Sequence, residues 1–196
     1  MNAAEATARA KSELRLKARA ARRALSPEER ADASTRIARV VLSLPELRDV
    51  SAVLAYGAMP EELDPELAIT GLFKRGVRLA LPRVIGPRKL QLHWWQPGEQ
   101  LHVTGKGMRE PLPTAPVASV TAIDAVLAPG VAYDRLGWRL GFGAGYYDAL
   151  FGEFDPSVMK IGVAFEEQVF PELPHDENDR PVDLVMTPRF VYRPRR

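Results

Sequence analysis

One stretch organises the rest of this chain: Arg139-Leu140-Gly141-Phe142-Gly143-Ala144-Gly145-Tyr146-Tyr147-Asp148. Three glycines alternate with other residues, so the backbone carries little steric bulk and a ligand can approach the main chain closely. Apolar residues then recur at helical spacing, at Tyr147, Leu150, Phe151 and Phe154. We therefore predict a glycine loop (residues 141–145) that leads into the N-terminus of a helix. Exposed N–H groups and the helix dipole make such a place receptive to phosphate.

The spacing of these glycines excludes two common nucleotide-binding motifs. The dinucleotide fingerprint G-x-G-x-x-G requires glycine at the position of Tyr146. A Walker A loop requires Gly-Lys followed by Ser or Thr, whereas Gly105-Lys106 is followed by Gly107. The loop pattern on its own therefore leaves two interpretations open, an anion-binding loop and a tight structural turn.

Short apolar segments alternate with amphipathic ones through most of the chain. This alternation predicts an α/β fold with a mainly parallel sheet and helices on both faces. No repeat, low-complexity tract or linker interrupts it, so residues 1–196 are expected to form a single domain. The Gly- and Pro-rich segment 98–116 is predicted to be a long loop. Strands are predicted at 50–56, 77–81, 90–95, 125–128 and 159–165, and helices at 4–25, 27–44 and 65–75.

Composition excludes several classes of protein. The chain has no cysteine, which excludes disulfides, thiolate catalysis and cysteine metal sites. A net charge of +2 does not indicate a dedicated nucleic-acid binder. No apolar run approaches the roughly 18 residues of a membrane span, and no signal-peptide core is recognisable. We expect a cytoplasmic enzyme with no membrane or nucleic-acid partner, and a monomer is compatible with these observations.

The segments before the glycine loop make its context more specific. Pro129-Gly130-Val131-Ala132-Tyr133-Asp134 and then Gly137 precede the Arg139–Asp148 stretch. Together they closely resemble the signature of the 5-formyltetrahydrofolate cyclo-ligase family, also called methenyltetrahydrofolate synthetase, and the resemblance extends from Lys11 to Thr187. It implies a three-layer α/β/α sandwich. It also implies the reaction of 5-formyltetrahydrofolate, a reduced folate, with ATP and Mg²⁺ to give 5,10-methenyltetrahydrofolate, ADP and phosphate.

The resemblance also implies site residues. Arg139 and Tyr147 would be catalytic, and Asp148 and Asp183 would hold Mg²⁺. Reduced folate would contact Met59, Asp64, Phe142 and Tyr146. ATP would contact the basic helix 4–25 and the glycine loop, through Lys11, Arg15, Arg139, Leu140, Gly141, Phe142, Gly143, Ala144, Gly145, Tyr146 and Tyr147.

Simpler roles remain open for several of these residues. Met59 could be ordinary core, and Asp64 could cap the helix that begins at Pro65. Tyr147 lies on the apolar helical stripe, so a packing role suits it equally, and Asp183 could be a surface residue. Most cations of the basic helix could form a solvated face. Two other functions also remain open: a non-catalytic folate or nucleotide sensor, and a nucleic-acid-binding module that uses the basic helix.

Overall fold

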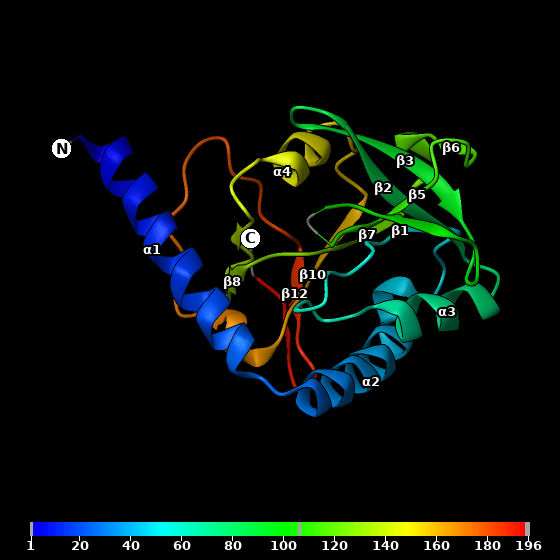
Figure 1. The fold of residues 1–196 in the computed structure, drawn as a ribbon, viewed down its shortest axis with the longest axis horizontal. Coiled ribbons are helices and arrows are strands. Elements are labelled where there is room, and N and C mark those ends of the chain that lie inside the picture. Colours follow the sequence, from blue (N-terminus) through cyan, green and yellow to red (C-terminus); the bar gives the residue numbers. More distant parts are fainter. Residues whose placement is uncertain (1, 106, 195–196) are drawn as a thin grey trace.

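The structure is a computed structural model that describes residues 2–105 and 107–194. Its centre is an eight-stranded sheet with the strand order β13-β12-β10-β7-β1-β2-β3-β6 (Figure 1). The strands of this sheet are β1 (Ala52–Leu54), β2 (Arg78–Gly86), β3 (Lys89–Trp95), β6 (Val117–Ala118), β7 (Ala125–Ala128), β10 (Met159–Val163), β12 (Leu184–Met186) and β13 (Val191–Tyr192).

The middle of the sheet is parallel. There β1 pairs with β2 and β7, and β10 pairs with β7 and β12. Antiparallel pairs lie toward the edges, where β2 pairs with β3, β3 with β6, and β12 with β13. A parallel sheet is covered on both faces, which explains why every residue of β1 and β7 is apolar and buried. The predicted mainly parallel sheet is confirmed.

Helices cover both faces of the sheet, as the three-layer prediction requires (Figure 1). On one face, Ile37 of α2 and Leu72 of α3 share a core with Leu79 of the sheet. On the other face, Leu150 of α4 packs in a second core with Val126. The helices are α1 (Ala3–Ala24), α2 (Pro27–Ser43), α3 (Glu66–Lys74) and α4 (Tyr146–Phe151), with short 3₁₀ helices η1 (Pro45–Leu47), η2 (Val120–Ala122) and η3 (Glu166–Gln168).

α1 lies beside the sandwich and packs on a small second sheet (Figure 1). That sheet contains β11 (Val169–Phe170), β8 (Ala132–Asp134) and β9 (Arg139–Leu140). Ala18 of α1 shares a third apolar cluster with Ala132 and Leu140 of the sheet. Since β9 ends where the glycine loop begins, this contact brings the basic helix next to the loop.

Two local expectations were wrong. The segment 98–116 is not a plain loop, because β4 (Leu101–Val103) and β5 (Arg109–Pro111) pair within it as an antiparallel hairpin. The helix after the glycine loop ends at Phe151, so Phe154 lies beyond it although its side chain is buried. The helical spacing of apolar residues from Tyr147 to Phe154 therefore indicated which side chains pack inside the protein, but it overestimated the length of the helix.

The packing of Tyr133 gives a test of the fold. A Cβ atom on Gly162 of β10 would lie 2.4 Å from Cε1 of Tyr133, whose ring is buried and whose hydroxyl donates to the Ala128 carbonyl at 2.7 Å. We expect Gly162→Ala to reduce the free energy of unfolding in urea by about 1–3 kcal/mol through overpacking. Gly86→Ala is the control, because a Cβ there meets nothing within 4 Å. Equal effects of the two changes would contradict this packing.

Candidate active site

A cavity of about 770 Å³ lies at the carboxyl ends of parallel strands. Tyr56 and Gly57 follow β1, and Pro129 follows β7, and all three line this main cavity. Its other walls come from α1, the β2–β3 hairpin, the glycine loop and the segment 176–179. Open α/β sheets place ligands in this position, since the loops that leave parallel strands gather at one edge.

Most of the predicted site residues meet in the main cavity, whereas Asp64 and Asp183 are not among its lining residues. The predicted residues that line it are Lys11, Arg15, Met59, Arg139, Leu140, Gly141, Phe142, Gly143, Ala144, Gly145, Tyr146, Tyr147 and Asp148.

The glycine loop presents its backbone to the main cavity. Gly143 and Gly145 have φ angles of 103° and 68°, in a region that favours glycine over residues with a Cβ atom. Phe142 is 47% exposed, with its ring 5.7 Å from the guanidinium of Arg22 and 6.0 Å from that of Arg19. The loop thus combines an accessible main chain with one aromatic side chain.

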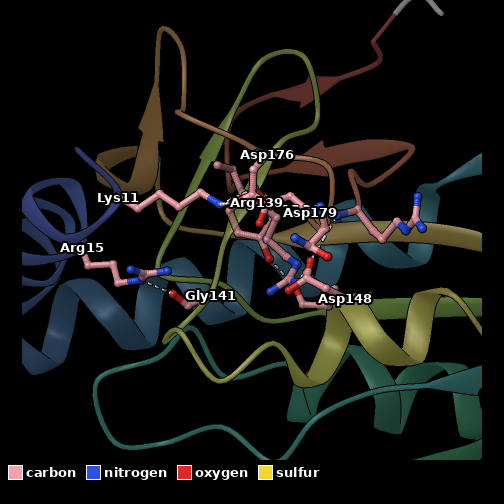
Figure 2. Close-up of polar contacts among 11 residues, drawn as sticks. Lys11, Arg15, Arg139, Gly141, Asp148, Asp176 and Asp179 are labelled. Atoms are coloured by element: carbon pink, nitrogen blue, oxygen red, sulfur yellow. Dashed lines mark hydrogen bonds and ion pairs between the residues drawn. The ribbon is translucent and has the colours of Figure 1, made fainter. Parts of the chain in front are cut away.

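α1 contributes three cations to the lining of the main cavity, Lys11, Arg15 and Arg19. Arg15 donates from Nε to the carbonyl of Gly141 at 2.8 Å, and Lys11 donates to carboxylates of Asp176 and Asp179 (Figure 2). Burial lowers the pKa of Lys11, but the hydrogen bonds to the two aspartates outweigh burial and raise it. Lys11 is therefore a protonated, buried cation at neutral pH.

An ion pair spans the glycine loop. Nη2 of Arg139 lies 2.9 Å from Oδ1 of Asp148, which also accepts the backbone N–H of Arg180 at 3.2 Å (Figure 2). The Arg139 guanidinium is buried and lies 5.6 Å from the ring centre of Tyr147 and 5.5 Å from that of Phe151. This charge is held in one position by a carboxylate and two aromatic rings.

The hydroxyl of Tyr147 is buried and has no hydrogen-bond partner among the described residues. Burial raises the pKa of this phenol, so it stays neutral and keeps its proton at physiological pH. The same ring packs edge-on against Phe151 at 5.9 Å. Tyr147 therefore has both the packing contact and a free donor, and the two roles left open by the sequence are compatible.

The acidic residue that lines the main cavity near Met59 is Glu62. Its carboxylate accepts the backbone N–H of Met59 at 3.0 Å, and burial raises its pKa. Asp64 instead lines a smaller adjacent cavity of about 550 Å³. Its carboxylate binds Arg109 at 2.7 Å and accepts the backbone N–H of Glu66, the first residue of α3. Pro65 is the N-cap residue of that helix, so Asp64 does not cap it in the way the alternative predicted.

Asp148 and Asp183 are not brought together in the structure. Asp183 precedes β12, and its Oδ2 accepts the backbone N–H of Lys160 in β10 at 2.7 Å. That position is at the amino ends of two parallel strands, opposite the edge that holds the main cavity. Asp176 and Asp179 line the cavity with Asp148 instead. No group of three or more His, Cys, Asp or Glu side chains suited to a metal occurs in residues 2–105 and 107–194.

Sequence reasoning missed Glu62, Asp176 and Asp179 as cavity residues. Glu62 stands two positions before the predicted Asp64, and Asp179 stands four before the predicted Asp183. In both cases a carboxylate close in sequence to the predicted residue lines the main cavity instead of it. The signal that separates them is the direction of each side chain, which follows from the local turn and not from residue type.

The structure defines an α/β protein with one large cavity, lined by cations, carboxylates and a glycine loop, at the carboxyl ends of its parallel strands. Residues 7–188 match the 5-formyltetrahydrofolate cyclo-ligase family. The chain belongs to this family. It is 30% identical over 176 residues to the 5-formyltetrahydrofolate cyclo-ligase of Escherichia coli, covering 87% of this chain and 96% of that protein. The mouse (Mus musculus) 5-formyltetrahydrofolate cyclo-ligase is 29% identical, over 90% of this chain and 93% of that protein.

Solved structures agree with this assignment. The NMR structure of the Aquifex aeolicus 5,10-methenyltetrahydrofolate synthetase superposes with a TM-score of 0.78 at 36% identity, covering 95% of this chain and 93% of that one. The structure of a 5,10-methenyltetrahydrofolate synthetase from Mycoplasma pneumoniae gives a TM-score of 0.74 at 23% identity, over 91% and 98% of the two chains. The second likeness shows a shared fold.

Proposed function

We propose that the protein converts 5-formyltetrahydrofolate and ATP into 5,10-methenyltetrahydrofolate, ADP and phosphate. One observation carries the proposal: a single cavity joins a bare glycine loop, buried cations and carboxylates to an aromatic and apolar wall. Phosphoryl transfer needs mainly positioning and charge neutralisation, which the glycine loop, the cations and the carboxylates supply. The aromatic and apolar wall suits a folate, which is flat and partly apolar.

In this proposal the phosphate chain of ATP lies along the glycine loop. Lys11 and Arg15 are spaced i, i+4 on α1, so both can reach one phosphate chain from the same helical face. Arg139 adds a third cation from the other end of the loop, where Asp148 holds it in place. The backbone N–H groups of residues 141–145 would add neutral donors.

Mg²⁺ fits the carboxylates of the main cavity. This ion takes one or two protein carboxylates together with phosphate oxygens and water, so it needs no larger cluster of protein ligands. Asp148 and Asp179 would hold it, with Asp176 beside them. When bound it would neutralise charge on the transferring phosphoryl group. Asp183 lies at the opposite edge of the sheet and is not included.

The folate would lie against Met59, Phe142 and Tyr146, with Glu62 available to accept hydrogen bonds from the N–H groups of its ring. The formyl oxygen attacks the γ-phosphorus and displaces ADP. N10 then attacks the formyl carbon and closes the ring, the N10 proton is lost to solvent, and phosphate leaves that carbon as the C–N double bond of the methenyl product forms. Both nucleophiles belong to the substrate, so the protein needs no Ser, Cys or His nucleophile. Tyr147 and Arg139 would act beside the reacting groups as a neutral donor and a fixed cation.

The remaining partners follow from the same site. Within the described part of the chain, none of the helices has the length and apolar character needed to cross a membrane. We place the reaction in the cytoplasm, where ATP and Mg²⁺ are supplied, and a monomer suffices because one chain lines the whole cavity. No nucleic-acid partner is proposed, because the net charge is only +2 and Arg22 of the basic helix is buried against Glu61 and Glu62.

The experiment that tests the function follows the near-ultraviolet absorbance of the methenyl product. Purified protein with 5-formyltetrahydrofolate and Mg-ATP should produce this band, and EDTA should abolish it. Arg139→Ala and Asp148→Ala should each reduce kcat by at least about 100-fold, as loss of a fixed charge-stabilising group does. Arg135→Ala is the control, since its side chain is exposed and lies outside the cavity. Tight folate binding without any band would indicate a sensor instead.

Substrate contacts are tested by comparing two neighbouring carboxylates. We expect Glu62→Gln to raise KM for 5-formyltetrahydrofolate by about tenfold or more, because a charged hydrogen-bond acceptor is lost. Asp64→Asn should change it by less than about threefold, since that carboxylate is occupied by Arg109 and Glu66. The reverse order of effects in steady-state kinetics would restore Asp64 as the folate residue.

Metal binding is tested in the same way. Asp179→Asn should raise the Mg²⁺ concentration for half-maximal activity by about tenfold and weaken Mn²⁺ binding measured by electron paramagnetic resonance. Asp183→Asn should leave both values unchanged but lower the free energy of unfolding by about 1–3 kcal/mol, because its carboxylate satisfies a backbone N–H. A weakened Mn²⁺ site in Asp183→Asn alone would overturn this assignment.

A further inference from the structure

Arg88 adopts a backbone conformation that its residue type disfavours. It lies at the tip of the β2–β3 hairpin, in the two-residue turn between the paired residues Gly86 and Lys89. Its φ angle is 56°, and it is the one non-glycine residue with positive φ in residues 2–105 and 107–194. Pro87 precedes it, and a turn with proline at this position normally carries glycine or asparagine next. A strained residue held in place is a reason to look for a function.

The side chain of Arg88 lies against the glycine loop. A Cβ atom placed on Gly145 would be 3.4 Å from Cζ of Arg88, and one placed on Gly143 would be 3.6 Å from Cζ of Arg15. Two guanidinium groups therefore bracket the glycine loop, Arg15 from α1 and Arg88 from the hairpin. The two elements lie on different sides of the molecule (Figure 1). Both arginines line the main cavity.

The cations of the main cavity fall into two groups: some are held by carboxylates, whereas Arg15, Arg19 and Arg88 form no ion pair among the described residues. Lys11, Arg139 and Arg109 each form ion pairs with carboxylates. Within the described part of the chain, Arg88 forms no ion pair, although it faces the same space. A guanidinium can bind phosphate oxygens through two parallel N–H donors, which a lysine cannot do. Arg88 therefore has its full donor set available for an anion that lies on the loop.

We propose that Arg88 is a further phosphate-binding residue, which binds the phosphate chain of ATP at the Gly145 end of the glycine loop. The inference rests on the proposed function for the identity of the anion. The carboxylates of the folate glutamate are a second source of the same oxyanion chemistry. The position of Arg88 on Gly145, inside the loop that carries the phosphates, favours ATP.

The test separates a ligand-binding role from a structural one. Arg88→Gly removes the guanidinium and relieves the backbone strain, so the urea midpoint should stay constant or rise. The Kd of Mg-ATP measured by calorimetry without folate should rise at least about tenfold, the loss expected for a charged hydrogen bond. Arg88→Lys should give an intermediate Kd, because lysine keeps the positive charge but lacks the two parallel N–H donors of the guanidinium. Lys89→Gln is the matched control, an exposed cation of the same hairpin outside the cavity lining.

Each outcome bears on the proposal. If Arg88→Gly binds Mg-ATP with a Kd within about twofold of the wild-type value, the proposal is overturned. An effect confined to KM for 5-formyltetrahydrofolate would also overturn it, because it would assign Arg88 to the folate carboxylates. A fall in the urea midpoint that parallels the loss of binding would indicate a structural role. If the wild-type protein binds Mg-ATP but forms no methenyl product, the proposed reaction is contradicted, whereas the role of Arg88 in phosphate binding is not. Failure of the wild type to bind Mg-ATP would overturn both.

Discussion

The ion pair of Arg139 and Asp148 closes the glycine loop at both of its ends, and the rest of the site depends on it. Two charges at low exposure are stable only when each is well paired, so the loop that joins them has little freedom to open. Glycines at 143 and 145 then permit the backbone angles that this closure requires. The loop becomes a rigid surface, against which α1 and the β2–β3 hairpin place their side chains.

α1 shows how a helix outside the central sheet becomes part of the site. Its apolar contact with the small sheet is modest, and its polar contacts are specific: Arg15 to the loop, Lys11 to two aspartates, and Arg22 to Glu61 and Glu62. Arg22 is only 2% exposed, which sets it apart from the exposed cations beside it. Arg22 thereby joins α1 to Glu62, a carboxylate of the main cavity.

The architecture was predictable because burial leaves a periodic trace in the sequence. Runs such as 125–128, buried on both faces, and the Ser26-Pro27 start of α2 identify their elements directly. The glycine loop was predictable because its backbone requirement restricts residue type. Glu62 lines the main cavity and Asp64 does not, and the same holds for Asp179 and Asp183. Which carboxylate faces the cavity depends on the direction of each local turn, and sequence spacing does not encode that direction. The burial of Arg22 and the reach of Arg88 depend on packing between distant elements, which no local pattern contains.

The contact between Lys11 and Asp176 joins positions 165 residues apart in the chain. During synthesis, which runs from the N-terminus, α1 emerges well before Asp176 and Asp179. At typical translation rates that interval is on the order of ten to thirty seconds. Throughout it, the nascent chain carries a basic helix whose acidic partners do not yet exist, beside the negatively charged ribosome. The contact can therefore form only after Asp176 has been synthesised, and a chain truncated before that residue would leave Lys11 without this partner.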